Sequence, residues 1–355
     1  MRIGILTHHF IANYGAFLQA YALQEAIKKG FPNDEVFIIN YIHFKHFIIN
    51  NGGWFRFYKN RETIGAWWQK IHLPLSFFYA RHQFLNLTKR CFNCQDVNKL
   101  KLDVIVVGSD EVWNFKDSKS NASIKFGKGL KCKRIIAYAP SVGNSTINDI
   151  IPEYVRKGLH TFSSISVRDS LGQQLVEHLI GQVPIKVLDP TFLIDLPTET
   201  VNIPKKDYIL FYYADNLPHH IKSQIFSYAK DHNLNVYGAG EYDKQYTDIT
   251  VNLTPFQWVW MFKNAKFIIT GTFHGVVFSI INNKQFKVYL TQKNRIRKVN
   301  DLLESLGIKN RNIENDFVLN LDYQGHEIDY TIVNKRMQNK VDESLTFLRN
   351  AIKCP

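Results

Sequence analysis

The sequence predicts an α/β protein in which two domains, each built on a parallel sheet, face a cleft. Short apolar runs alternate with amphipathic helical patterns through most of the 355 residues. The chain is also too long for one ordinary core, since single domains usually hold roughly 100 to 200 residues. The polar stretch 194–206, which contains Pro197 and Pro204, is the expected boundary between the two halves.

The elements follow in chain order. Apolar runs in the first half predict strands at 2–7, 35–40, 103–107, 134–138, 163–167 and 185–188, with a helix at 15–29 after the first strand. Runs in the second half predict strands at 208–213, 235–237, 266–270 and 286–290, with helices at 218–232, 255–264, 275–282 and 299–306. We therefore expect an N-terminal domain at 1–195, a C-terminal domain at 206–325 and a final helix within 329–355.

Composition narrows the function classes. A formal charge of +13 predicts attraction to phosphates, but the chain has no RNP, zinc-finger or dense Lys/Arg motif, so we expect no nucleic-acid partner. No apolar run reaches the ~20 residues that span a bilayer, and the first residues resemble a strand more than a secretory signal. We expect a cytoplasmic protein. Cys91 and Cys94 form an isolated CxxC pair that no second pair completes, so no metal site is predicted.

The segment 43–84 interrupts the alternation. It is crowded with aromatic residues and holds basic residues, with Glu62 as its single acid. One interpretation is an insertion whose surface meets anionic lipid headgroups at the inner face of the cell membrane, or stacks on sugar rings. The other is a helical subdomain whose aromatic side chains form a core.

Polar residues follow the strands of the first half, at the sheet edge where α/β proteins bind ligands. Arg168 stands directly after the fifth strand. Each residue alone fits a capping turn, but together they predict a ligand-binding edge. The others are Asn13, Tyr14, Gly15 and Gln19 after the first strand, Ser109, Asp110, Trp113 and Asn114 after the third, and Ser141 after the fourth.

The most informative stretch of the second half is 270–279, where a strand gives way to a helix. Gly271 allows a sharp turn, and His274 falls near the first turn of the helix, between Gly271 and Gly275. A ligand there would meet free backbone N–H groups and an imidazole that titrates near neutrality. A helix-capping or core histidine is the alternative. The basic run 293–298 follows the next strand and is a second candidate for binding phosphate.

These motifs, in this order, resemble those of the polysaccharide pyruvyl transferases. The matching motifs are Asn13-Tyr14-Gly15-Ala16 with Leu18-Gln19-Ala20, Gly108-Ser109-Asp110 with Trp113-Asn114, Tyr138-Ala139 with Ser141, Val167-Arg168-Asp169, Leu188-Asp189-Pro190-Thr191 and Phe273-His274-Gly275. The resemblance implies two Rossmann-like domains similar to those of GT-B glycosyltransferases. It implies a metal-independent enzyme without a cofactor, which uses phosphoenolpyruvate as donor. The product would be a pyruvate ketal on a sugar of a bacterial capsule, an exopolysaccharide or a lipid-linked precursor.

The resemblance also implies roles for residues. His274 and Arg168 would be catalytic, with the donor in the C-terminal domain and the acceptor in the N-terminal domain. The implied donor contacts are Arg168, Gly271, Thr272, His274, Gly275, Arg295 and Arg297, and the implied acceptor contacts are Asn13, Tyr14, Gly15, Gln19, Ser109, Asp110, Trp113, Asn114 and Ser141.

The chain departs from the family pattern at Thr272, where an arginine commonly stands, so Arg295 or Arg297 would supply the missing charge. Because of this departure, two alternatives stay open: a glycosyltransferase that uses a nucleotide sugar, and a non-catalytic glycan-binding member. Asp189 is expected to hold a loop by accepting backbone N–H bonds.

Overall fold

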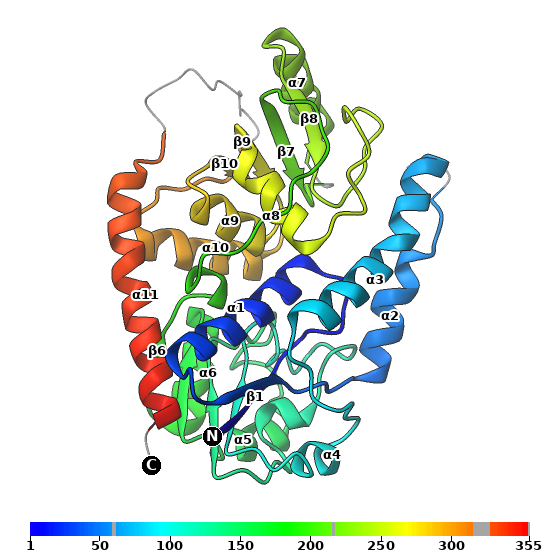
Figure 1. The fold of residues 1–355 in the computed structure, drawn as a ribbon. Coiled ribbons are helices and arrows are strands. Elements are labelled where there is room, and N and C mark those ends of the chain that lie inside the picture. Colours follow the sequence, from blue (N-terminus) through cyan, green and yellow to red (C-terminus); the bar gives the residue numbers. More distant parts are fainter. Residues whose placement is uncertain (59–61, 215–216, 315–326, 354–355) are drawn as a thin grey trace. The chain divides into compact units, whose positions relative to one another are not determined.

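A computed structural model describes residues 1–58, 62–214, 217–314 and 327–353 (Figure 1). The chain divides into two compact units. Unit 1 comprises Met1–Gly53, Phe77–Asp195 and Gln338–Pro355, and unit 2 comprises Trp54–Ser76 and Leu196–Met337. The end of the predicted C-terminal domain, 315–325, lies outside the described residues.

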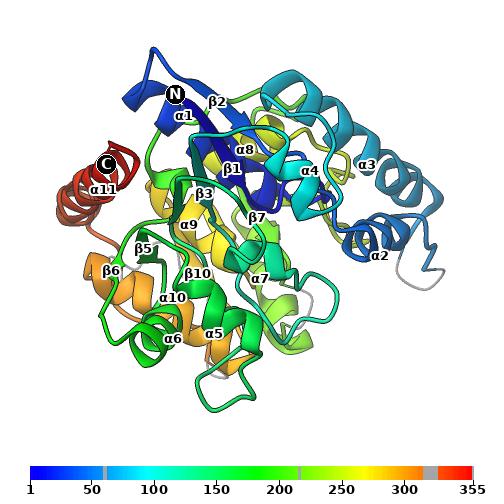
Figure 2. The ribbon, with the colours of Figure 1, turned by 90° about the horizontal axis from the view of Figure 1, so that it is seen from below.

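Unit 1 contains a sheet of six parallel strands in the order β2-β1-β3-β4-β5-β6. The strands are β1 (Arg2–Leu6), β2 (Glu35–Ile38), β3 (Val104–Val107), β4 (Arg134–Ala137), β5 (Ser164–Val167) and β6 (Ile185–Lys186). The helices and 3-10 turns between them are α1 (Tyr14–Gly30), α4 (Cys94–Asn98), η1 (Ser123–Phe126), α5 (Glu153–Leu159), α6 (Ser170–Ile180) and η2 (Pro190–Phe192). β1 pairs with β2 on one side and with β3 on the other, so the order of connection reverses between β1 and β3 (Figure 2). Ligands of open parallel sheets bind at the carboxyl ends of strands beside such a reversal.

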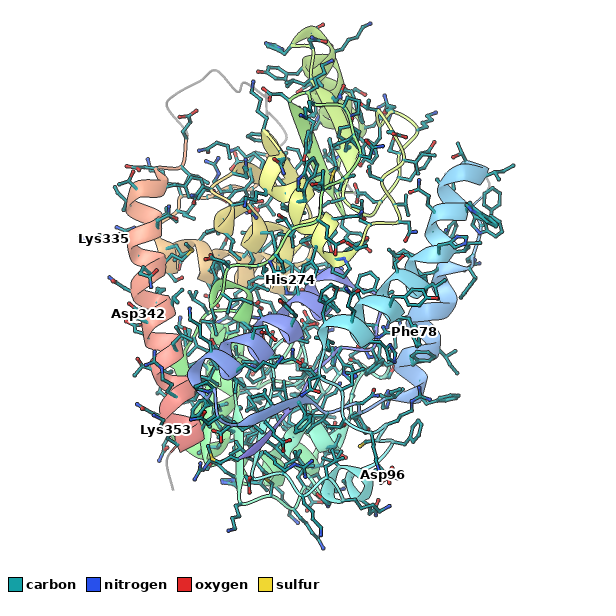
Figure 3. The ribbon with its side chains drawn as sticks, in the orientation of Figure 1. Phe78, Asp96, His274, Lys335, Asp342 and Lys353 are labelled. Carbon is teal, nitrogen blue, oxygen red and sulfur yellow. The ribbon has the colours of Figure 1, made fainter. Side chains whose placement is uncertain are left out.

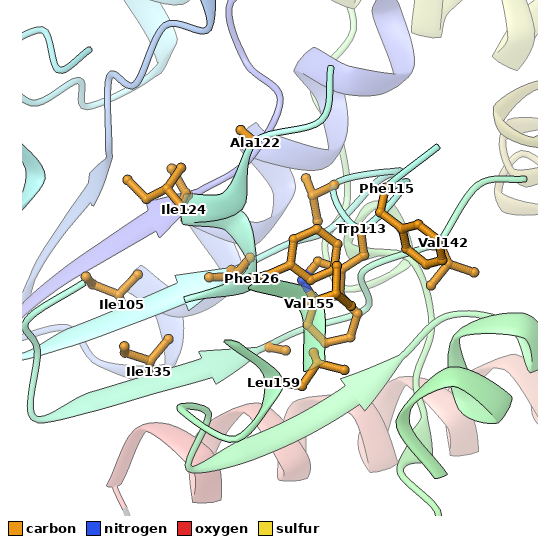
Figure 4. Packing of buried hydrophobic residues seen from close by; sticks show 14 of the residues in the cluster. Ile105, Trp113, Phe115, Ala122, Ile124, Phe126, Ile135, Val142, Val155 and Leu159 are labelled. Atoms are coloured by element: carbon orange, nitrogen blue, oxygen red, sulfur yellow. The ribbon is translucent and has the colours of Figure 1, made fainter. Parts of the chain in front are cut away.

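The core of unit 1 lies beneath this edge. Trp113 is fully buried and stacks on Phe126 with ring centroids 5.9 Å apart, within the apolar cluster of Figure 4. β3 is buried along its whole length, as expected for a central parallel strand that is covered on both faces.

Unit 2 contains a sheet of four parallel strands in the order β10-β9-β7-β8. The strands are β7 (Tyr208–Tyr212), β8 (Asn235–Gly238), β9 (Phe267–Thr270) and β10 (Gln285–Val288). The helices are α7 (His219–Asp231), α8 (Pro255–Asn264), α9 (Phe273–Ile281) and α10 (Lys293–Leu306). Here the order of connection reverses between β7 and β9, so the residues after these two strands mark the equivalent edge. The two sheets confirm the predicted α/β class with two Rossmann-like units.

The predicted insertion is helical and is divided between the units. It forms α2 (Phe44–Trp54) and α3 (Ile64–Phe84), and Lys59 and Arg61 of this segment lie outside the described residues. We expected the whole segment to belong to the N-terminal domain, but Trp54–Ser76 groups with unit 2. Hydrogen bonds join it to that unit: Gln69 donates to the carbonyl of Ile249 at 3.1 Å, and Ser76 donates to the Asn252 side chain at 2.8 Å.

The final helix, α11 (Tyr330–Lys353), also contributes to both units. Its C-terminal half belongs to unit 1, where the Ser344 hydroxyl accepts the Leu188 N–H at 3.0 Å and Arg134 donates to the Ile352 carbonyl. Within the described ranges, none of the helices is both long enough and apolar enough to cross a bilayer.

Candidate functional site

The edge between β1 and β3 is held together by the buried side chain of Gln19. Its amide nitrogen donates to the Thr7 hydroxyl at 2.9 Å, and its amide oxygen accepts the Ser109 N–H at 3.2 Å. The side chain therefore joins the residues that follow β1 to those that follow β3. Because Gln19 and Ser109 are fully buried, they support this edge from within, and the expectation that they touch an acceptor is not met.

Three other predicted acceptor residues are also buried and bonded within the protein. Trp113 lies in the core, and its indole N–H donates to the Lys125 carbonyl at 2.9 Å. The Ser141 hydroxyl donates to Asp169 at 2.6 Å, while Asn114 accepts from Ser145 at 3.0 Å. These three side chains shape the loops rather than face a ligand.

The residues at the start of α1 also make contacts within the protein. Asn13 caps the helix by accepting the Ala16 N–H at 2.9 Å. Tyr14 and Gly15 are buried, and Tyr14 packs on Phe77 with ring centroids 5.0 Å apart. Asn13 and Asp110 are the predicted acceptor residues that keep intermediate exposure.

Arg168 lies in a buried ion pair. Its side chain is 4% exposed, its Nη1 lies 2.6 Å from Asp189 Oδ2, and its Nη2 lies 3.7 Å from Asp110 Oδ1. Burial lowers the pKa of the guanidinium, but the neighbouring carboxylates of Asp189 and Asp110 outweigh it, so the pKa is raised overall. A cation already matched by two carboxylates is poorly placed to grip an anionic donor. The structure shows Arg168 bound to Asp110 and Asp189, and its contact with the donor stays a prediction.

A cluster of basic side chains stands at the same edge of unit 1, and the sequence did not single it out. His8, two residues after the end of β1, contacts the amine of Lys125 through Nε2. Its ring meets that of His46 edge to face, with centroids 5.0 Å apart. Lys125 is fully buried in η1, while His8 and His46 are 4% and 7% exposed. We call His8, His46 and Lys125 the basic cluster. The sequence indicates this cluster only through the histidines that follow the first strand. Nothing in the sequence links Lys125 to them.

In unit 2, His274 occupies the first turn of α9, at the carboxyl end of β9 (Figure 3). Thr272 caps this helix by accepting the Gly275 N–H at 2.9 Å. His274 and Thr272 keep intermediate exposure. The histidine therefore lies where the sequence predicted, beside the backbone N–H groups of a helix start.

The flanking glycines serve the packing of this turn. A Cβ on Gly271 would lie 2.1 Å from the Tyr213 carbonyl oxygen, and one on Gly275 would lie 1.9 Å from Thr270 Oγ1. Both glycines are buried. They are required for close approach within the chain, so a direct donor contact, as predicted for both, is not needed to account for them.

The basic run lies in the first turns of α10, which begins at Lys293 rather than near residue 299 as predicted. Arg295 and Arg297 are exposed. Because β9 and β10 are parallel neighbours, the starts of α9 and α10 follow the same edge of the sheet. Tyr213, which the sequence did not indicate, follows β7 at this edge and is 41% exposed.

The cysteines and acids form no further site in the described part of the chain. Cys91, Cys94 and Cys132 are free thiols, and burial raises the pKa of Cys91. Among the residues with described positions, no group of three His, Cys, Asp or Glu side chains has the arrangement of a metal site.

Comparison with known proteins adds the family. No curated protein matches the chain. Similar solved structures include the UDP-GlcNAc 2-epimerase from Methanocaldococcus jannaschii, which is 12% identical with a TM-score of 0.47 and coverage of 96% of this chain and 93% of that one. A putative UDP-N-acetylglucosamine 2-epimerase from Listeria monocytogenes is 8% identical with a TM-score of 0.49 and coverage of 99% and 91%, respectively. The glycosyltransferase SnogD from Streptomyces nogalater is 11% identical with a TM-score of 0.45 and coverage of 99% and 98%, respectively.

Similarity at that level carries no inference about activity. The family model described as polysaccharide pyruvyl transferase, however, matches residues 13–292, from the cap of α1 to the residue before α10. The chain therefore belongs to the polysaccharide pyruvyl transferase family.

Proposed function

We propose that the protein transfers the enolpyruvyl group of phosphoenolpyruvate to two hydroxyls of a sugar and so forms a pyruvate ketal on a bacterial surface polysaccharide or its lipid-linked precursor. The observation that supports this donor is the arrangement of residues at the carboxyl edge of the sheet in unit 2. There, the helix starts that hold His274 and the exposed Arg295 and Arg297 follow the neighbouring strands β9 and β10. Phosphoenolpyruvate bears a phosphate and a carboxylate, and both are groups that helix N-termini and arginines bind.

The charges at α10 strengthen this assignment. The first turn of α10 holds basic residues and no acid, although the N-terminal end of a helix is itself positive. An anion bound there would relieve this repulsion. Thr272, two residues before His274, carries no charge, and its hydroxyl caps α9. In this proposal, the positive side chains that bind the donor therefore come from α10.

The reaction needs a group that moves protons. The methylene carbon of the donor takes up one proton, a sugar oxygen bonds to the neighbouring carbon, and the second sugar oxygen bonds there as phosphate leaves. The two hydroxyl protons end on the new methyl group and on the phosphate, so atoms balance without a cofactor or a metal. We assign this role to His274, because one imidazole nitrogen can accept a proton while the other donates one.

Unit 1 would then hold the acceptor. Its reversal edge presents Asn13 and Asp110, and the buried Gln19 and Arg168 fix the loops that carry them. Arg168 thus acts through Asp110 rather than on the donor.

Ligand-induced thermal stabilisation tests the donor, because a ligand that binds only the folded state raises Tm. We expect phosphoenolpyruvate to raise Tm of the wild type, and His274→Ala to reduce the shift while the fold is kept. A shift with nucleotide sugars and none with phosphoenolpyruvate would instead establish the glycosyltransferase alternative. No shift with any donor, together with glycan binding that His274→Ala leaves intact, would favour a non-catalytic member.

We also propose that the protein works at the cytoplasmic face of the membrane, through the outer face of α3. Ile64, Trp68, Leu75 and Tyr79 fall on one helical face and are 77%, 59%, 48% and 61% exposed, and Phe78, labelled in Figure 3, adjoins them. α3 contains no Asp or Glu. The preceding Glu62 is paired with Lys70, while Arg56 is exposed. An apolar face without acids, in a chain of charge +13, suits an anionic lipid surface.

Vesicle flotation tests this surface. We expect phosphatidylglycerol vesicles to float the wild type at low salt and phosphatidylcholine vesicles to do so less, since salt screens exposed charges. Trp68→Ser with Tyr79→Ser should abolish flotation. Ile332→Ser, which changes an apolar residue of α11 that is 52% exposed, should not. Self-association that the double variant abolishes, without flotation, would show that a second copy covers this face and would overturn the lipid proposal.

A further inference from the structure

We propose that the basic cluster of unit 1, His8, His46 and Lys125, is a binding subsite for an anionic group, a phosphate or a carboxylate, carried by the acceptor sugar. Its His8 lies two residues after the end of β1, at the reversal edge where parallel sheets bind ligands. Calling the ligand an acceptor rests on the proposed function, whereas the affinity for an anion rests on the cluster alone.

The amine of Lys125 has no carboxylate partner within ion-pair distance in the described part of the chain. It contacts His8 Nε2 and donates to the Ser120 carbonyl at 3.0 Å, which leaves one of its three N–H donors. The two nearby acids are engaged elsewhere: Asp110 with Arg168, and Asp117 with Ser120. A buried lysine without a counter-ion is costly, and a bound anion would supply the missing charge.

His46 supplies an independent observation. Its Nδ1 is buried, and no hydrogen-bond partner for it exists among the described residues. The ring is 7% exposed, and its centroid lies 5.0 Å from that of His8, whose Nε2 contacts Lys125, so a ring with an unused nitrogen adjoins this pair. An anion that accepts a hydrogen bond from this nitrogen would displace no bond within the protein. Leaving a buried polar atom unsatisfied costs free energy that the ligand would recover.

The protonation of the cluster agrees with this geometry. Burial lowers the pKa of Lys125 to about 7 and that of His46 to about 4, and holds the pKa of His8 well below its ordinary value. The neighbouring charges act in both directions. His9, His43 and Lys119 lower these pKa values further, while Asp110 and Asp117 oppose the shift. A bound anion would raise the pKa of all three groups, so binding takes up protons and is tighter at lower pH.

Calorimetric titration with glucose 1-phosphate, glucuronate and glucose at pH 6.5 and 8.5 tests the subsite. We expect a charged sugar to bind and glucose not to bind, with the tighter binding at pH 6.5. The phosphate probe and the carboxylate probe distinguish the two sources of negative charge. His46→Leu and Lys125→Met should each weaken binding at least tenfold, whereas Lys116→Met, which removes an exposed lysine from the same loop region, should not.

His46→Leu is expected to fold, because it removes a nitrogen without a described partner, and it keeps the test valid if Lys125→Met does not fold. The subsite is overturned if no charged sugar binds better than glucose, or if both cluster variants bind as the wild type does. Phosphoenolpyruvate affinity should be unchanged in both variants. A wild type that ignores phosphoenolpyruvate but binds a charged sugar through the cluster would refute the proposed donor and leave the subsite standing.

Discussion

At the scale of single residues, most polar side chains that the motifs contain are engaged inside the protein. Gln19, Ser109 and Ser141 are fully buried and hydrogen-bonded, and Arg168 is matched by carboxylates. A polar residue after a strand looks the same in sequence whether it faces a ligand or supports the loop that does. Among the predicted donor residues, His274 keeps intermediate exposure, and Arg295 and Arg297 of α10 are exposed.

Arg168→Ala should act on stability before it acts on binding. It leaves the Asp189 carboxylate, whose side chain is 0% exposed, without its cation. Removing one partner of a buried pair costs about 3–5 kcal/mol, so urea unfolding should show a loss of that order. The folded fraction should bind phosphoenolpyruvate as the wild type does. A variant of normal stability that has lost this affinity would restore the donor-binding role of Arg168.

Acid should destabilise the protein through its buried histidines. Burial holds the pKa of His9 and His46 at about 4, below the ordinary 6.5 of the unfolded chain. Between these values the unfolded chain binds more protons, so the free energy of unfolding falls as pH drops from 6.5 towards 4. His46→Leu removes one such group and should lose about 2 kcal/mol less than the wild type between pH 7 and 4.5, by urea titration. Equal losses in both proteins would contradict this account.

At the scale of elements, the strands could be predicted from the sequence because the local apolar pattern agrees with burial in the fold. All ten strands lie within a few residues of the predicted ranges, since apolar β-branched runs such as β3 are buried on both faces. Among the helices, α4 and α5 were not predicted, and the start of α10 was missed because the charged run 293–298 shows no apolar periodicity. The basic cluster could not be predicted, since it depends on contacts between residues 117 positions apart in the chain.

The start of α9 depends on a glycine. In Gly275→Ala the new methyl group would lie 1.9 Å from Thr270 Oγ1, so strand and helix must shift apart. Overpacking of this kind costs about 1–3 kcal/mol, measurable by urea unfolding, and should weaken phosphoenolpyruvate binding through His274. Gly52→Ala in α2 is the control, because its Cβ would meet nothing within 4 Å. Equal stability of both variants would contradict the close packing at this turn.

At the scale of the whole molecule, the division into units was predicted in outline but not in detail. Pattern locates the seam near 196, yet it cannot show that Trp54–Ser76 joins unit 2 through Gln69 and Ser76, because such pairings span about 180 residues. The same limit applies to the final helix, which the sequence treats as one element and the structure shares between the units.

The central claim is that phosphoenolpyruvate binds at the edge of unit 2 where α9 and α10 begin. Calorimetric titration of phosphoenolpyruvate into the wild type, Arg295→Ala with Arg297→Ala, and Lys266→Ala tests it most directly. Lys266 is an exposed cation just before β9, at the opposite edge of the same sheet, and so controls for net charge. We predict that the double variant weakens binding at least tenfold and that Lys266→Ala changes it less than twofold. Equal affinity in all three proteins, or no binding to any of them, would contradict the account.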